Sequence, residues 1–116
     1  MRNQLALLGL ALAVAGCAAV PDAVSTHHLE NARAAYRAAA ASPEVQSRAA
    51  VELQVAERSL ADAERFYRAD ADRAMVAHFA YLAEQRARIA LKTAELRAAE
   101  AALATSRTPA SSGATR

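Results

Sequence analysis

The sequence predicts an all-α protein: an antiparallel hairpin of two long, alanine-rich helices with a shorter N-terminal helix, three helices in all. Alanine, the strongest helix former, provides 35 of the 116 residues. Between Val24 and Thr105 there is one proline and no glycine. Apolar residues in this part recur every three or four positions, which is the period of a helix that buries one face.

The first sixteen residues are expected to be a signal peptide. Leu5–Val14 is an apolar run of ten residues that follows Arg2, and a positive flank before an apolar core is typical of signal peptides. As a helix this run would be about 15 Å long, whereas the hydrocarbon core of a bilayer is about 30 Å thick. The segment is therefore too short to remain as a membrane span.

Val14, Ala15, Gly16 and Cys17 resemble the lipobox of bacterial lipoproteins. The resemblance implies that Cys17 is the lipidation site and becomes the new N-terminus, with a diacylglycerol on its thiol and usually an acyl chain on its amine. Two or more chains hold a protein stably in a membrane, whereas one chain holds it marginally. In enterobacterial sorting, Asp after the cysteine retains a lipoprotein at the inner membrane. Ala18 therefore implies the outer membrane, with the protein facing the periplasm.

The mature chain, residues 17–116, is expected to form one small domain of nearly balanced charge. The 14 basic residues of the chain less Arg2 leave 13, against 12 acidic residues, and the arginines are dispersed. Nucleic-acid binding and electrostatic membrane binding need clustered charge. Neither is expected, so acylated Cys17 is the predicted contact with the membrane.

Residues 17–24 are expected to form the acylated tether, and residues 25–105 the helical domain. The first helix is predicted over about residues 25–41, beginning at Ser25 or Thr26. Its apolar face recurs at spacings of three and four: Leu29, Ala32, Tyr36 and Ala39.

The second helix is predicted over residues 43–68. Ser42 can cap it, Pro43 suits the first helical position, and Glu44 complements the positive end of the helix dipole. Its predicted buried stripe alternates steps of four and three: Ala49, Leu53, Ala56, Leu60, Ala63 and Tyr67.

A turn at residues 68–72 is expected before the third helix, over residues 72–105, with Asp70 or Asp72 as its N-cap. The alternative is one continuous rod, since the turn holds no glycine or proline. The large apolar residues of the third helix, however, lie about 200° round the helix from the extension of the second stripe. A hairpin lets both stripes face each other. The third stripe is predicted to be Met75, Phe79, Leu82, Ile89, Leu96 and Leu103.

Two further predictions concern the surface of this hairpin. Oppositely charged residues four positions apart are expected to mark solvated faces; these pairs are Glu44/Arg48, Glu64/Arg68 and Glu84/Arg88. Residues 106–116 are expected to be a disordered tail.

Three segments resemble a family of helical modules on bacterial envelope lipoproteins, domain of unknown function 4398. They are Ala50–Glu57, Leu60–Glu64 and His78–Arg86, and the resemblance extends from Ser42 to about Glu100. Relatives often carry this module ahead of an OmpA-like domain that binds peptidoglycan. The chain stops at Arg116, where such a domain would begin. We therefore expect the helical module without it, and the peptidoglycan-binding activity is not implied.

No catalytic, cofactor or metal site is expected. His27 and His28 are adjacent and would point about 100° apart on a helix, and His78 has no HxxxH partner, whereas a metal site needs three or four converging ligands. Asp70 and Asp72 are not followed by the glycine and the twelfth-position glutamate of a calcium loop. Nucleophile elbows and phosphate loops are absent from the sequence, so an enzyme is not expected.

The expected function is a structural or protein-interaction module of the cell envelope that binds an envelope protein or a second copy of itself. The alternative is non-covalent binding of peptidoglycan or a small ligand. A ligand site needs a sizeable concave pocket, and the thin alanine-rich core favours the first function. Murein lipoproteins are joined to peptidoglycan through a C-terminal lysine, whereas this chain ends in Thr115–Arg116. A covalent link to peptidoglycan is therefore not expected.

Tyr81, Gln85 and Arg88 are the candidate docking residues. Tyr81 lies about 200° from Phe79, so a hairpin of two helices would leave its ring in water. One explanation is that the first helix covers the ring, with Leu29, Ala32 and Tyr36. The other is a docking site, because tyrosine and arginine are enriched at interface hot spots.

Overall fold

The computed structural model describes residues 21–108, and every regular element in that range is a helix. This confirms the predicted all-α class for the described residues. Residues 1–20, which include the predicted signal peptide and Cys17, and residues 109–116 of the predicted tail lie outside them. The elements are α1 (Asp22–Ala40), α2 (Pro43–Arg48), α3 (Ala50–Arg68) and α4 (Arg73–Arg107).

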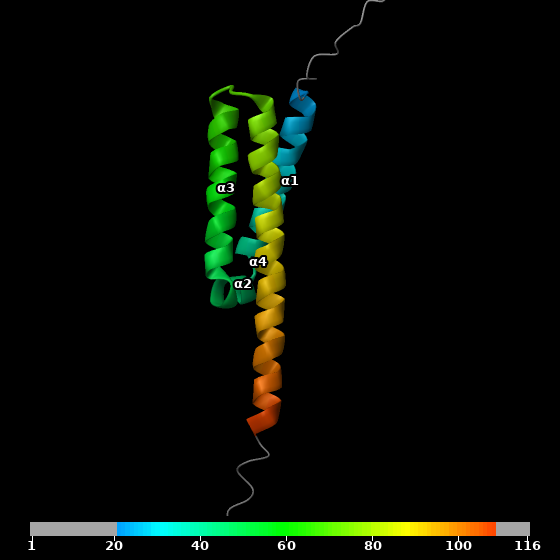
Figure 1. Ribbon diagram of the computed structural model, residues 1–116, viewed down its shortest axis with the longest axis vertical. Coiled ribbons are helices and arrows are strands. Elements are labelled where there is room, and N and C mark those ends of the chain that lie inside the picture. Colours follow the sequence, from blue (N-terminus) through cyan, green and yellow to red (C-terminus); the bar gives the residue numbers. More distant parts are fainter. Residues whose placement is uncertain (1–20, 109–116) are drawn as a thin grey trace, which may run out of the picture.

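Helices α3 and α4 form an antiparallel hairpin, and α1 lies beside α4 and runs in the same direction (Figure 1). The N-termini of α1 and α4 meet at one end of the bundle, where Arg73 Nε lies 2.7 Å from Asp22 Oδ1. At the other end, Val45 of α2 packs with Ala90 and Ala94 of α4. The domain is thus a three-helix bundle, and the short α2 links α1 to α3.

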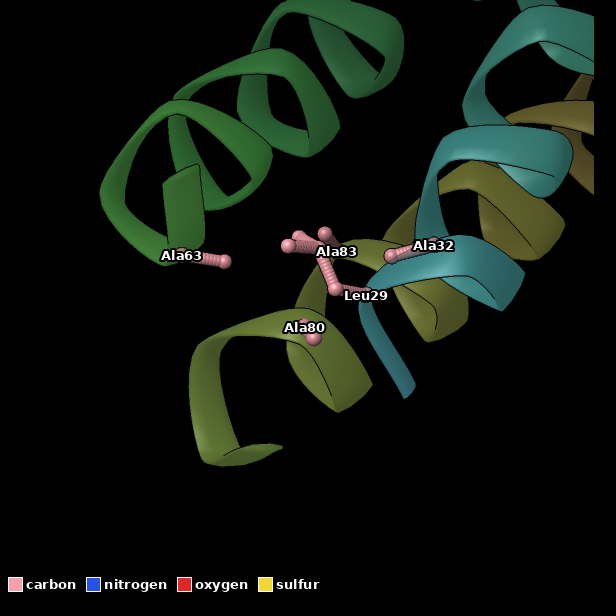
Figure 2. Packing of buried hydrophobic residues seen from close by; sticks show 5 residues of the cluster. All are labelled: Leu29, Ala32, Ala63, Ala80 and Ala83. Carbon is pink, nitrogen blue, oxygen red and sulfur yellow. The ribbon is translucent and has the colours of Figure 1, made fainter. Parts of the chain in front are cut away.

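Alanine forms most of the core. Figure 2 shows Leu29 and Ala32 of α1, Ala63 of α3, and Ala80 and Ala83 of α4 gathered between the three helices. Side chains this small let helix axes approach closely. The fully buried residues of α4 are spaced alternately four and three apart, as a heptad seam is: Val76, Ala80, Ala83, Ala87, Ala90 and Ala94.

The predicted stripe of α4 is therefore wrong at most of its positions, although Phe79 is partly buried against the core. Ile89, Leu96 and Leu103 are 55%, 60% and 57% exposed, and Met75 is exposed as well. The buried seam lies one position further along the chain, about 100° round the helix. The physical reason is that α4 packs against both α1 and α3, so the face turned toward the space between them is buried. Alanine fits that narrow space better than leucine.

The predicted helix over residues 43–68 is also corrected, because it breaks at Ala49 into α2 and α3. Ala49 has φ −139° and ψ 34°, outside the helical region. The carbonyl of Arg48 accepts a hydrogen bond from the guanidinium of Arg97 on α4. The break lets Val45 and Ala49 both reach α4. The capping prediction is confirmed, since Ser42 Oγ accepts from Val45 N at 3.3 Å.

The predicted hairpin turn is confirmed, and the continuous rod is excluded. Asp72 is the N-cap of α4 and accepts from Ala74 N at 2.9 Å. Asp70, the other predicted cap, instead adopts a left-handed conformation with φ 48°, which aspartate tolerates better than most residues. Ala71 N donates to Phe66 O at 3.1 Å and closes the turn.

The bounds of α1 and α4 differ from those predicted. Helix α1 begins at Asp22 rather than at Ser25 or Thr26, so it extends into the predicted tether. It has 19 residues, as many as α3, so it is not the shorter helix that was predicted. The hydroxyl of Ser25 donates to Asp22 O at 2.9 Å inside the first turn of α1. Helix α4 continues to Arg107, so residues 106 and 107 of the predicted tail are helical.

Candidate functional site

The candidate docking residues Tyr81, Gln85 and Arg88 lie along one outer face of α4. Tyr81 is 51% exposed, Gln85 is half-buried and Arg88 is exposed. The expectation that the first helix covers Tyr81 is wrong, because Leu29 and Ala32 point into the core instead, against Ala80 and Ala83 (Figure 2). The phenol ring therefore remains available for contact.

Arg88 also borders a groove of about 410 Å³ between α1 and α4. Its guanidinium Nη2 lies 2.5 Å from Glu84 Oε1, and Glu84 is only 9% exposed. The prediction that this pair marks a solvated face is therefore wrong for Glu84, because α1 covers its side of α4. The groove is lined by Asn31, Ala34, Ala35, Glu84, Arg88 and Leu91.

Besides the Asp22–Arg73 pair at the end of the bundle, two ion pairs join helices that are far apart in the sequence. Arg33 of α1 binds Glu64 of α3, with Nε–Oε1 at 2.6 Å and Nη2–Oε2 at 2.8 Å. Arg97 of α4 binds Glu52 of α3, with Nη2–Oε1 at 2.9 Å. The hydrogen bonds from Arg33 lower the pKa of the Glu64 carboxyl. The pKa of Glu52 is lowered by its own backbone N–H and by Arg97. The closer partner of Glu64 is thus Arg33 on another helix. Arg68, the partner predicted on the same helix, lies 4.0 Å away.

A second groove, between α3 and α4, was missed by the sequence-based prediction. It has a volume of about 220 Å³ and is lined by Val51, Glu52, Val55, Arg86 and Ile89. Arg86 donates to the hydroxyl of Ser59 on α3. Within the described residues no carboxylate forms an ion pair with Arg86. A signal for this surface exists in the sequence: large apolar residues repeat every seven positions at Met75, Leu82, Ile89, Leu96 and Leu103.

The described residues contain no group of three His, Cys, Asp or Glu side chains that could hold a metal ion. Asn31 Nδ2 lies 3.2 Å from His27 Nε2, four positions away on the same helix. His78 lies edge-on to Phe79, with ring centroids 5.4 Å apart. Within residues 21–108, no helix is both long enough and apolar enough to span a bilayer. The predicted lipidation site, Cys17, lies outside this range.

Neither a search of curated proteins nor a search of solved structures gave a match. One family profile does match, over residues 27–106, which is most of the chain and includes nearly all of the bundle. Its description is a domain of unknown function, DUF4398. The match extends beyond the segments that carried the resemblance in the sequence, because it includes most of α1. On this evidence the chain belongs to the DUF4398 family.

Proposed function

We propose that this protein is a lipoprotein of the bacterial outer membrane that faces the periplasm and acts there as a structural or protein-interaction module. The observation that carries the proposal is the run Val14–Cys17, which resembles a lipobox, placed directly before a helical bundle. A di- or triacylated cysteine would hold the protein in its leaflet without help from the protein surface.

The geometry of the bundle supports this arrangement. Helix α1 begins at Asp22, five positions after Cys17. Five residues of extended chain span at most about 18 Å. The same end of the bundle holds the start of α4, because Asp22 pairs with Arg73. An acylated Cys17 would therefore keep this end close to the membrane surface.

The exposed side chains support an interaction role. Tyr81 projects from α4 beside Gln85 and Arg88, and the side of the hairpin formed by Val51, Val55 and Ile89 carries exposed apolar groups. Contiguous exposed apolar surface, rimmed by polar groups, marks contact sites on many soluble proteins. The proposed module binds through such surfaces rather than through a reacting group.

Metabolic labelling with palmitate, followed by separation of inner and outer membranes, tests the proposal. The native chain should incorporate label and sediment with the outer membrane. Cys17→Ser should incorporate none and should be soluble or retain its signal peptide. Ala18→Asp is the matched control, because in an enterobacterial host it should keep the label and move to the inner membrane. Unlabelled native protein in the soluble periplasmic fraction would refute the lipoprotein assignment.

A further inference from the structure

The α3–α4 hairpin holds α1 along one of its sides. Leu29 and Ala32 of α1 pack there against alanines of both hairpin helices (Figure 2). An ion pair also crosses this contact, from Arg33 of α1 to Glu64 of α3. This side of the hairpin therefore shows how it binds a helix: aliphatic and small side chains fill the seam, and opposite charges meet beside it.

A second groove of the hairpin, which we name the open groove, is lined by Val51, Glu52, Val55, Arg86 and Ile89. It lies on a different side from α1. Glu84 lines the groove beside α1, and Arg86, two positions later, points about 200° round α4 from it. Val51 is 71% and Ile89 55% exposed. Among residues 21–108, none from α1 or α2 lines the open groove, so its aliphatic surface is uncovered.

The carboxylates on this side of α3 are already paired. Glu52 binds Arg97 of α4, with Nη2–Oε1 at 2.9 Å. Asp62, farther along α3, binds Arg65, with Nη2–Oδ1 at 3.1 Å. Each pair is neutral as a whole, so neither carboxylate balances a further cation.

Two carboxylates of α3 and α4 form no ion pair within the described residues, and both lie elsewhere. Glu57 lines a different groove, with Tyr36 of α1. Glu100 follows Arg86 on α4 and is about 21 Å from it along the helix axis. Neither carboxylate therefore neutralises a charge in the open groove.

Two arginines at the open groove keep their positive charges unpaired. Arg86 is half-buried and donates to the hydroxyl of Ser59 on α3, which leaves other N–H donors of its guanidinium free, since an arginine has about five. Arg58 is exposed and follows Val55 by three positions, so both side chains lie on the same side of α3. Within residues 21–108 neither arginine forms an ion pair. The open groove thus combines an aliphatic surface with two uncompensated positive charges.

We propose that the open groove binds an acidic amphipathic helix of another envelope protein. Apolar residues three and four positions apart on that helix would cover the aliphatic surface, and its carboxylates would pair with Arg86 and Arg58. A neutral or basic helix would bury Arg86 without a partner, which is strongly unfavourable. The charges are reversed relative to α1, where the arginine belongs to the bound helix and the glutamate to the hairpin. The proposal names the partner of the interaction module proposed above and rests on it, but it does not depend on acylation.

The position and size of the open groove favour a weak protein contact over contact with a lipid surface. Ile89 lies about 24 Å along α4 from Arg73, which is at the end proposed to be near the membrane. Helix α3 has 19 residues and is about 28 Å long. A helix about 12 Å across that buried about a third of its surface over this length would bury about 350 Å². The total of about 700 Å² is typical of transient contacts, so we expect a dissociation constant in the micromolar range.

Two designed peptides test the charge complementarity. Each has three heptads with leucine and alanine at the a and d positions, and the e and g positions are glutamate in one peptide and lysine in the other. Binding to the full chain, purified in mild detergent, is measured by fluorescence anisotropy of the labelled peptide, and detergent without protein gives the background. The native chain should bind the glutamate peptide at least tenfold more tightly than the lysine peptide.

Charge reversal locates the bound peptide. Arg86→Glu should weaken binding of the glutamate peptide at least tenfold and should strengthen binding of the lysine peptide. Arg37→Glu makes the same change on α1, outside the open groove, and should leave both affinities nearly unchanged. Circular dichroism checks that both variants remain helical. Equal affinities of the native chain for the two peptides, or equal effects of the two variants, would overturn the proposal.

Photocrosslinking in intact cells tests the identity of the partner. Ile89→benzoylphenylalanine should crosslink a protein whose attached peptide, identified by mass spectrometry, belongs to an acidic amphipathic helix. Arg37→benzoylphenylalanine is the control and should not give this product, and Arg86→Glu should remove it. A basic segment, a second copy of this chain, a phospholipid or no product at Ile89 would contradict the proposal. Loss of palmitate labelling would contradict the lipid anchor alone and leave the peptide results unchanged.

Discussion

Arg33 on α1 and Glu64 on α3 form a two-point ion pair that ties the N-terminal helix to the hairpin. Both side chains are largely shielded from solvent. Paired in this way, charged groups form hydrogen bonds that are stronger than neutral ones. Together with the packing of Leu29 and Ala32 in the core, this contact holds α1 against the hairpin.

We expect Glu64→Gln to lower the free energy of unfolding by about 1–2 kcal/mol, because Arg33 loses its charged acceptor in a partly buried site. Urea denaturation of the purified chain measures the loss. Glu30→Gln is the matched control, because Glu30 also binds Arg33 but is more exposed, and it should cost less than about 0.5 kcal/mol. Equal losses for the two variants would show that the contact between α1 and α3 is not the stronger one.

The same pair predicts a pH dependence of stability. The pKa of Glu64 in the folded state is below its ordinary value of 4.5, so the unfolded state binds the proton more readily. The stabilisation is therefore complete above pH 4.5 and is lost as the pH falls through the folded-state pKa. The difference in melting temperature between the native chain and Glu64→Gln should shrink below pH 4.5. A constant difference from pH 7 down to acid would contradict the assignment.

Ala87→Leu should destabilise the bundle by about 2 kcal/mol or more, because Ala87 is fully buried with Ala39 and Ala56 of the facing helices and a larger side chain would force them apart. Ala99→Leu makes the same change on the exposed part of α4 and should have little effect. Thermal denaturation followed by circular dichroism distinguishes the two. A stable Ala87→Leu variant would mean that the alanine seam is not closely packed.

Two glycines inserted after Ala71 should change stability only slightly, because residues 69–72 form a loop and loops tolerate extension. The same insertion after Gln85 is the control. There each glycine costs about 1 kcal/mol in helix propensity, and the seam beyond it is shifted out of register. Helicity and melting temperature are the readouts, and a similar large loss at both positions would argue against the turn.

Tyr81→Ala should change the free energy of unfolding by less than about 0.5 kcal/mol, because the ring is exposed. Leu29→Ala, which truncates a fully buried side chain, should cost about 2–5 kcal/mol. If Tyr81 is a docking residue, its substitution should remove a crosslinked partner in intact cells while stability is kept. Unchanged stability together with an unchanged crosslink pattern would remove Tyr81 from the docking site.

Local features of the fold were predictable from the sequence. Ser42 and Asp72 cap their helices as their positions indicate, and the turn between α3 and α4 lies where the stripes change phase. A cap acts within three residues and helix propensity acts residue by residue. Such features need no knowledge of the neighbouring helices. Of the candidate site, the sequence also identified Tyr81 as a ring left in water by the hairpin, which its exposure confirms.

Other features depended on contacts between distant residues. The sequence of α4 contains two stripes about 100° apart, one of leucine and isoleucine and one of alanine. Size favours burial of the larger residues when a helix has one partner. The tertiary structure places α1 and α3 together on the alanine stripe, and Ile89, Leu96 and Leu103 are left exposed. Glu84 is buried in the same packing. The predicted second helix breaks at Ala49, so Val45 belongs to α2 and not to α3.

The sequence by itself therefore determined that this protein is helical, where its hairpin turns, and the resemblance to a lipobox that predicts Cys17 as its anchor. Only the tertiary structure decided which face of α4 is buried and which charges meet, as Arg33 and Glu64 do across thirty-one positions. The physical reason is the range of the interactions. Hydrogen bonds within a helix join residues four positions apart, whereas burial depends on where the chain returns after its turns.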